Sequence, residues 1–84
     1  MSFKLWYGLA KTQEEFAAMK PGWTHRVADS MDEALWLAMK VNDDGRAIAW
    51  EIEGDDGSRL NRQEIIERVR QQKHELIANP PKKY

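Results

Sequence analysis

The densest group of chemically capable side chains in this 84-residue sequence is a run of carboxylates in its central third. Carboxylate oxygens can bind a hard cation, and an EF-hand loop places acids at positions 1, 3 and 5 ahead of a glycine at position 6. Counting back from Gly45 and Gly57 puts Lys40 and Ile52 at position 1, so neither loop fits. We therefore interpret the aspartates beside these glycines as turn-forming residues. The acidic residues of the whole run are Asp43, Asp44, Glu51, Glu53, Asp55 and Asp56.

The two histidines, His25 and His74, are the next candidates for acid–base or metal chemistry. They are not at ligand spacing, and the sequence fixes no acid or nucleophile beside either one. The chain has no cysteine, phosphate loop, dinucleotide fingerprint or nucleophile elbow. We therefore expect no catalytic residue, no metal and no cofactor, and we expect that the protein is not an enzyme.

Basic side chains offer a different chemistry, which is contact with phosphates. Charge is uneven along the chain, with a net of −6 over residues 31–57 and +4 over residues 58–84. Within the basic part, Arg62, Arg70 and Lys73 lie near one side of a predicted helix and could form a ridge for a nucleic-acid backbone. Three glutamates of the same helix interrupt that field, so nucleic acid is the alternative partner rather than the first.

Two of the four tryptophans fall outside a simple core pattern. On a helical wheel Trp36 lies on the arc that carries carboxylates, and Trp6 lies on the outward face expected for a strand. Large exposed aromatics are typical of protein interfaces, although Trp36 could instead cover a neighbouring loop or the C-terminal tail. We predict a small non-enzymatic interaction module that binds a protein partner, or a second copy of itself, through these tryptophans.

The outward face of the sheet should carry mostly small side chains around Trp6. Such a flat, half-apolar face invites a partner, a second copy or the chain's own first helix. Its expected members are Lys4, Trp6, Gly8, Thr24, Arg26, Ala28, Ala47, Ala49 and Glu51. The candidate binding residues are therefore Trp36, Trp6, Arg26, Arg62, Arg70 and Lys73.

Three capping boxes indicate where helices begin. Thr12, Ser30 and Asn61 each stand three residues ahead of a glutamate, and each can accept a hydrogen bond from that glutamate's N–H. The boxes predict helices over about 12–19, 30–41 and 61–78. The third should be the longest helix and the main cover of the sheet, through a stripe of Ile65, Ile66, Val69, Leu76 and Ile77.

Alternating segments between these helices predict strands at 3–9, 23–29 and 46–53. A turn before the third strand leaves Gly45 able to take a positive φ. The expected inward residues are Phe3, Leu5, Tyr7 and Leu9 in the first strand, Trp23, His25 and Val27 in the second, and Ile48, Trp50 and Ile52 in the third.

The order β-α-β-α-β-α predicts an α+β protein with a small three-stranded sheet and helices packed on one face, with the pairing direction left open. We expect one domain over residues 1–79 and a disordered tail over 80–84, where Pro80 and Pro81 stop the last helix. The chain has no cysteine, no run of about 20 apolar residues and no signal-peptide pattern. We therefore expect a cytoplasmic protein with no membrane partner.

Overall fold

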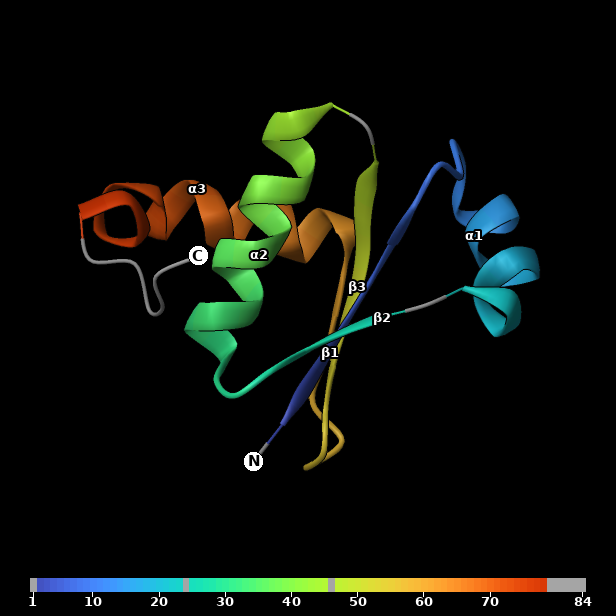
Figure 1. The fold of residues 1–84 in the computed structure, drawn as a ribbon, viewed down its shortest axis with the longest axis horizontal. Coiled ribbons are helices and arrows are strands. Elements are labelled where there is room, and N and C mark those ends of the chain that lie inside the picture. Colours follow the sequence, from blue (N-terminus) through green and yellow to red (C-terminus); the bar gives the residue numbers. More distant parts are fainter. Residues whose placement is uncertain (1, 24, 46, 79–84) are drawn as a thin grey trace.

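The computed structural model describes residues 2–23, 25–45 and 47–78, and Figure 1 shows their arrangement. The fold is α+β, as predicted, but the sheet has four strands rather than three. The fourth strand escaped prediction because three residues are too few to show an alternating pattern. The tail predicted at 80–84 lies outside the described residues. The elements in chain order are β1 (Phe3–Gly8), α1 (Gln13–Met19), the 3₁₀ turn η1 (Lys20–Gly22), β2 (His25–Ala28), α2 (Met31–Asp44), β3 (Ile48–Gly54), β4 (Arg59–Asn61) and α3 (Arg62–Ala78).

All three predicted cap residues cap their helices, but only Asn61 and Glu64 form the full reciprocal capping box that the sequence predicts. The cap side chain accepts a hydrogen bond from the N–H three residues on, at 3.1 Å for Thr12, 3.1 Å for Ser30 and 2.9 Å for Asn61. Glu64 reaches back to the Asn61 N–H at 3.2 Å, whereas the other two glutamates accept from the residue before the cap at 2.9 Å. α2 ends at Asp44 and is followed by the cap residue Gly45, which takes the positive φ that the sequence predicted, at 70°.

The sheet is antiparallel throughout, in the order β2-β1-β3-β4. Its register changes within the β1–β3 pair, where Trp6 faces Glu51 but Tyr7 faces Ala49. Trp50 therefore has no partner in β1, which makes it the extra residue of a β-bulge. Because of this extra residue, the residues of β3 from Trp50 back to Ile48 point to the opposite faces of the sheet from those that regular alternation would give them.

The bulge overturns part of the face assignment made for β3. Ile52 and Ala49 pack beneath α2 and α3, whereas Ile48 and Trp50 belong to a cluster on the opposite face. The prediction that Ile48, Trp50 and Ile52 share one buried face, with Ala49 outside, is therefore wrong. Strict alternation cannot anticipate an inserted residue.

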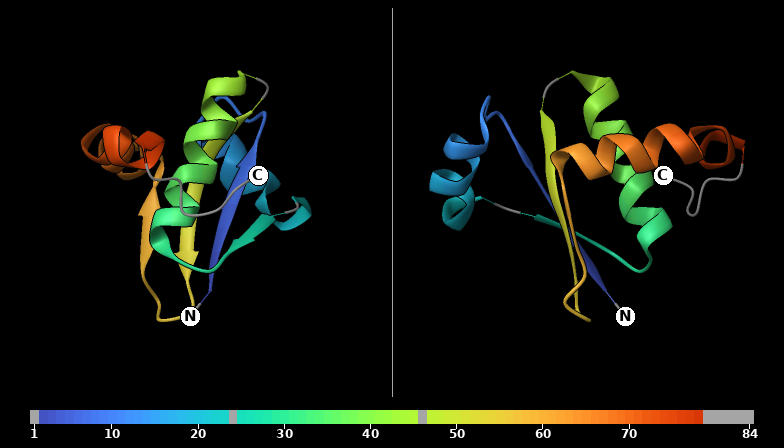
Figure 2. Two further views of the ribbon diagram at one scale, coloured as in Figure 1. Left: turned by 60° about the vertical axis from the view of Figure 1, so that its left-hand side comes forward. Right: turned by 180° about the vertical axis from the view of Figure 1, so that it is seen from behind.

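The main core lies between the sheet and the pair α2 and α3. Figure 1 and Figure 2 show these two helices on one side of the sheet and α1 on the other, so the prediction of all helices on one face is wrong for α1. The buried members are Phe3, Leu5, Ala28, Ala34, Leu35, Trp36, Leu37, Ala38, Met39, Ala49, Ile52, Leu60, Ile65 and Leu76.

A second, aromatic core lies on the α1 side. Phe16 of α1 stacks on Trp50, with ring centroids 5.5 Å apart and planes 8° from parallel. Ala10 completes the buried cluster, and Trp6, Trp23 and Ile48 pack against it. Gly8 permits this packing, since a Cβ there would lie 2.6 Å from the Trp23 ring. The first helix thus covers one end of the face that the sequence left open to several occupants.

The predicted faces of β2 are inverted. Ala28 pairs with Phe3 and is fully buried, whereas Val27 is 58% exposed and His25 is exposed. A four-residue strand at an edge shows too little pattern to fix its register, which β1 sets through pairing. Leu9, also expected inside, follows the end of β1 and is exposed.

α3 is the longest described helix, as predicted, but α2 is the main cover of the sheet. α2 contacts β1, β2 and β3 and buries seven consecutive residues, 33–39, whereas α3 contacts β3 and β4. Within the predicted stripe Ile65 and Leu76 are buried and Val69 packs against the core, while Ile66 is half-buried and Ile77 is exposed. α3 extends away from the sheet towards its end (Figure 1).

Ile65→Ala should lower the free energy of unfolding by about 2–5 kcal/mol, because it opens a cavity at a fully buried position. Ile77→Ala on the same helix removes the same atoms at an exposed position and should change stability by no more than about 0.5 kcal/mol. Urea denaturation of both variants measures the difference. Equal shifts of the two denaturation midpoints would contradict the assignment of Ile65 to the core and of Ile77 to the surface.

Candidate functional site

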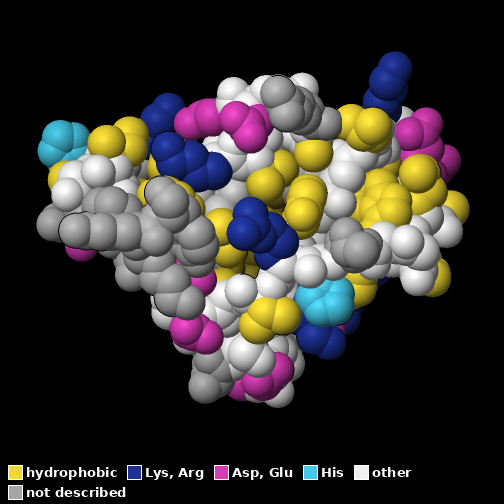
Figure 3. Space-filling view, in the orientation of Figure 1, with side chains coloured by type: hydrophobic (Ala, Val, Ile, Leu, Met, Phe, Trp, Pro, Cys, Tyr) yellow, Lys and Arg dark blue, Asp and Glu magenta, His cyan; other side chains and the backbone are white. Residues whose placement is uncertain are grey.

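A groove lies between the outer strand β2 and the C-terminal half of α2. It has a volume of about 340 Å³. A hollow of about 190 Å³ adjoins it, shares three lining residues with it and adds Tyr7 and Ala47. Figure 3 shows this face, where hydrophobic side chains gather around a basic one near the centre. We call this the β2 groove, lined by Arg26, Trp36, Leu37, Lys40, Val41 and Asp44.

Strand pairing brings Arg26 into the β2 groove. Arg26 pairs with Leu5, so the two side chains share the face that α2 covers. The prediction that Arg26 lies on the opposite face of the sheet is therefore wrong, for the same reason as for the rest of β2. Lys40 and Asp44, one helical turn apart on α2, add one charge of each sign. The groove thus has a mixed-sign rim around an apolar floor.

Trp36 lines the same groove but is not exposed as the helical wheel indicated. Only 9% of the residue is accessible, and it belongs to the main core cluster. The Lys40 ammonium lies 5.4 Å from its ring centroid, an arrangement that favours a cation–π interaction. Two predicted binding residues, Trp36 and Arg26, therefore meet at one site. Lys40 was missed, although its i,i+4 spacing from Trp36 was visible in the sequence.

β2 forms an edge of the sheet. It pairs with β1 on one side, and no described strand pairs with its other side. In Figure 1 it crosses in front of the other strands, and its residue Arg26 lines the groove. An edge strand of this kind presents unpaired backbone donors and acceptors to any strand that approaches.

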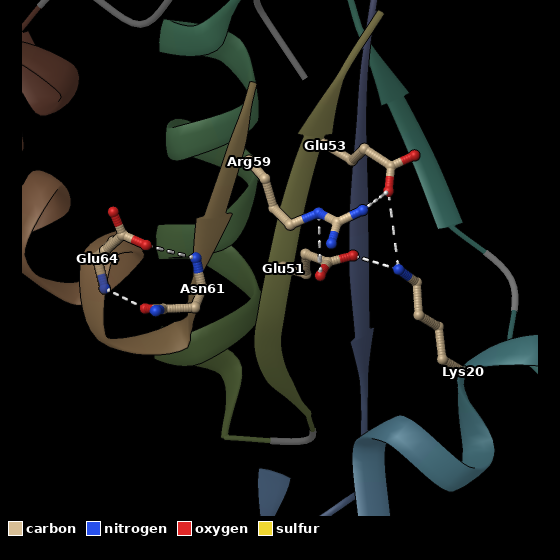
Figure 4. Close-up of polar contacts among 6 residues, drawn as sticks. All are labelled: Lys20, Glu51, Glu53, Arg59, Asn61 and Glu64. Carbon is tan, nitrogen blue, oxygen red and sulfur yellow. Dashed lines mark hydrogen bonds and ion pairs between the residues drawn. The ribbon is translucent and has the colours of Figure 1, made fainter. Parts of the chain in front are cut away.

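Trp6 lies on the sheet face opposite α2 and α3, as predicted, but the chain itself covers it there. The Lys20 ammonium lies 5.0 Å from the Trp6 ring centroid, and Lys20 forms an ion pair with Glu51. Arg59 is 3.3 Å from Glu53 and 3.7 Å from Glu51, so two bases and two acids form one network (Figure 4). The Trp6 indole N–H is buried without a partner in the described part of the chain.

The three basic residues of the predicted nucleic-acid ridge do not gather into one site. The Arg62 guanidinium lies 5.1 Å from the Trp50 ring centroid, at the start of α3. Arg70 and Lys73 follow about 12 Å and 17 Å further along the helix axis, at 1.5 Å per residue. None of the three lines the β2 groove.

The acids of the β3–β4 turn are engaged locally. The pKa of Asp55 is lowered mainly because the Ser2 hydroxyl donates a hydrogen bond to its carboxylate, and the Ser2 N–H adds another. The pKa of Asp56 is lowered in the same way by the hydroxyl and N–H of Ser58. Over residues 2–23, 25–45 and 47–78, no group of three or more His, Cys, Asp or Glu side chains could hold a metal ion.

Comparison of the chain with protein-family models, with curated proteins and with solved structures gives no match. Among the described helices, none has the length and apolar character that crossing a membrane requires.

Lys20→Ala should speed hydrogen exchange at the Trp6 indole N–H, because it removes the side chain that lies over this ring and pairs with Glu51. Lys40→Ala is the matched control, since it removes a lysine that lies over Trp36 instead. Nitrogen-15 NMR of the indole signals resolves the tryptophans separately. Unchanged exchange at Trp6 in Lys20→Ala would show that Lys20 does not protect this ring.

Proposed function

We propose that this chain is a small non-enzymatic interaction module that self-associates through the outer edge of β2. The observation that carries the proposal is the edge strand itself, with exposed residues, bordering a groove of mixed charge. Strand addition at such an edge forms main-chain hydrogen bonds, and the groove beside it can supply selectivity.

Two-fold symmetry restricts how two copies of β2 can pair. In an antiparallel pair, directly opposed residues lie on the same face of the sheet, so a two-fold axis normal to the sheet must pass midway between the two copies of one residue. An axis at Arg26 would oppose two arginines. An axis at Val27 opposes two exposed valines and places Arg26 opposite the small Ala28. The second arrangement avoids like charges and buries apolar surface, so we adopt it.

The charges of the β2 groove support a second copy as the partner. Arg26 and Lys40 would repel a strongly basic segment, and Asp44 would repel a strongly acidic one. A surface with both signs complements its own copy across a two-fold axis. Val27 supports the same choice, because it is a large hydrophobic residue left 58% exposed on the edge strand.

Val27→Lys should convert a dimer to a monomer, because it places two ammonium groups opposite each other at the axis. Light scattering across a concentration series measures the mass. Ile77→Lys is the matched control, since Ile77 is a comparably exposed hydrophobic residue on a different surface, and it should leave the dimer intact. A wild-type protein that stays monomeric throughout, or a dimer that Val27→Lys leaves unchanged, would overturn the proposal.

The same axis can be located by crosslinking, because the wild-type chain has no cysteine. Directly opposed residues of an antiparallel pair have Cα atoms about 4.5–5.5 Å apart, which a disulfide can bridge. Val27→Cys should therefore form a disulfide-linked dimer under mild oxidation, and Ile77→Cys should not. Equal crosslinking of both variants would indicate random collision rather than pairing at β2.

A further inference from the structure

A histidine, His25, lies on β2, the edge strand that we propose to pair with its own copy, and it is exposed. It pairs with Trp6 of β1, and the centroids of the two rings are 4.7 Å apart with planes tilted by 47°. This contact places the imidazole on the sheet face opposite α2 and α3. Val27, two residues further along β2, has its side chain on the same face. The imidazole therefore lies beside the residue at the proposed two-fold axis.

The proposed axis determines which residue faces His25 across the interface. In an antiparallel pair, residues equally distant from Val27 are opposed, so His25 of each copy lies opposite Asp29 of the other. Asp29 directly follows β2 and is exposed. Its backbone N–H donates a hydrogen bond to the Glu33 carboxylate at 2.9 Å, which anchors the chain where the strand ends. Alternation then places the Asp29 side chain on the same face as His25 and Val27.

The charged groups around His25 within its own copy are mostly basic. Its directly opposed residue, Trp6, is uncharged. Lys4 lies one diagonal position along β1, and the Lys20 ammonium lies 5.0 Å from the Trp6 ring centroid. Glu51 opposes Trp6 from β3, on the far side of β1, and forms an ion pair with Lys20. The second copy therefore brings a carboxylate directly opposite the imidazole, which its own strand pairing does not.

We infer that protonation of His25 strengthens the self-association of this chain, through an ion pair with Asp29 of the second copy. The inference rests on the proposed function and adds its regulation. Histidine side chains ordinarily change charge between about pH 5 and 8, where aspartate is ionised. The two-fold axis generates two such ion pairs, one on each side of Val27. Because the dimer favours the protonated imidazole, association takes up protons, and it weakens as the pH rises through this range.

Sedimentation equilibrium at about pH 5.5 and about pH 8, at constant ionic strength, measures the dissociation constant of the dimer on either side of this transition. We expect the constant to be about two- to thirtyfold lower at the acidic pH, as two cross-strand ion pairs of ordinary strength would give. His25→Gln keeps a polar side chain that cannot be protonated, and it should remove most of this difference. His74→Gln, at an exposed position of α3, is the matched control and should retain it.

Asp29→Asn tests the other member of the pair. It should remove the same pH dependence, and combining it with His25→Gln should remove no more, because both substitutions act on one interaction. Equal dissociation constants of the wild type at the two pH values, or a pH dependence that persists in His25→Gln, would overturn the inference and leave the proposed dimer standing. A wild-type protein that is monomeric at both pH values would instead overturn the proposed self-association, and the inference with it.

Discussion

The extra residue in β3 determines how the rest of the molecule is arranged. Because Trp50 has no partner in β1, β3 presents Ile52 and Ala49 to α2 and α3 but Trp50 and Ile48 to α1. Without the bulge, regular alternation would place Trp50 among the helices and Ala49 on the α1 side. The α1 side would then lack the buried indole on which Phe16 stacks. One inserted residue thus divides the apolar side chains of a short chain between two faces of its sheet.

Because helices pack against both faces of the sheet, its two edge strands are the parts left open to a partner. α3 contacts β4 at one edge, whereas no described element pairs with the outer side of β2 at the other. The β2 groove at this open edge carries charges of both signs, which fits a second copy of the chain.

The local features of the fold could be predicted from the sequence, and the non-local ones could not. The caps at Thr12, Ser30 and Asn61 and the left-handed Gly45 depend on residues within four positions, so their chemistry can be recognised directly. The bulge, the inverted faces of β2 and the burial of Trp36 depend on which segments pack together. A helical wheel places Trp36 among carboxylates, but it cannot show which other segments of the chain pack against that side of the helix, and Trp36 is in fact buried. The sequence identified Arg26 and Trp36 as candidate binding residues, but it could not predict that they line one groove, because that depends on how β2 packs beside α2.

Proton–proton distances around the Trp50 ring test the division of the core most directly. A nuclear Overhauser spectrum should connect the Trp50 indole protons with the Phe16 ring and the Ala10 methyl group, because these residues form one buried cluster on the α1 side. Connections from Trp50 to the methyl groups of Leu35 and Ile65, which lie in the core beneath the helices, would contradict the bulge and the arrangement that follows from it.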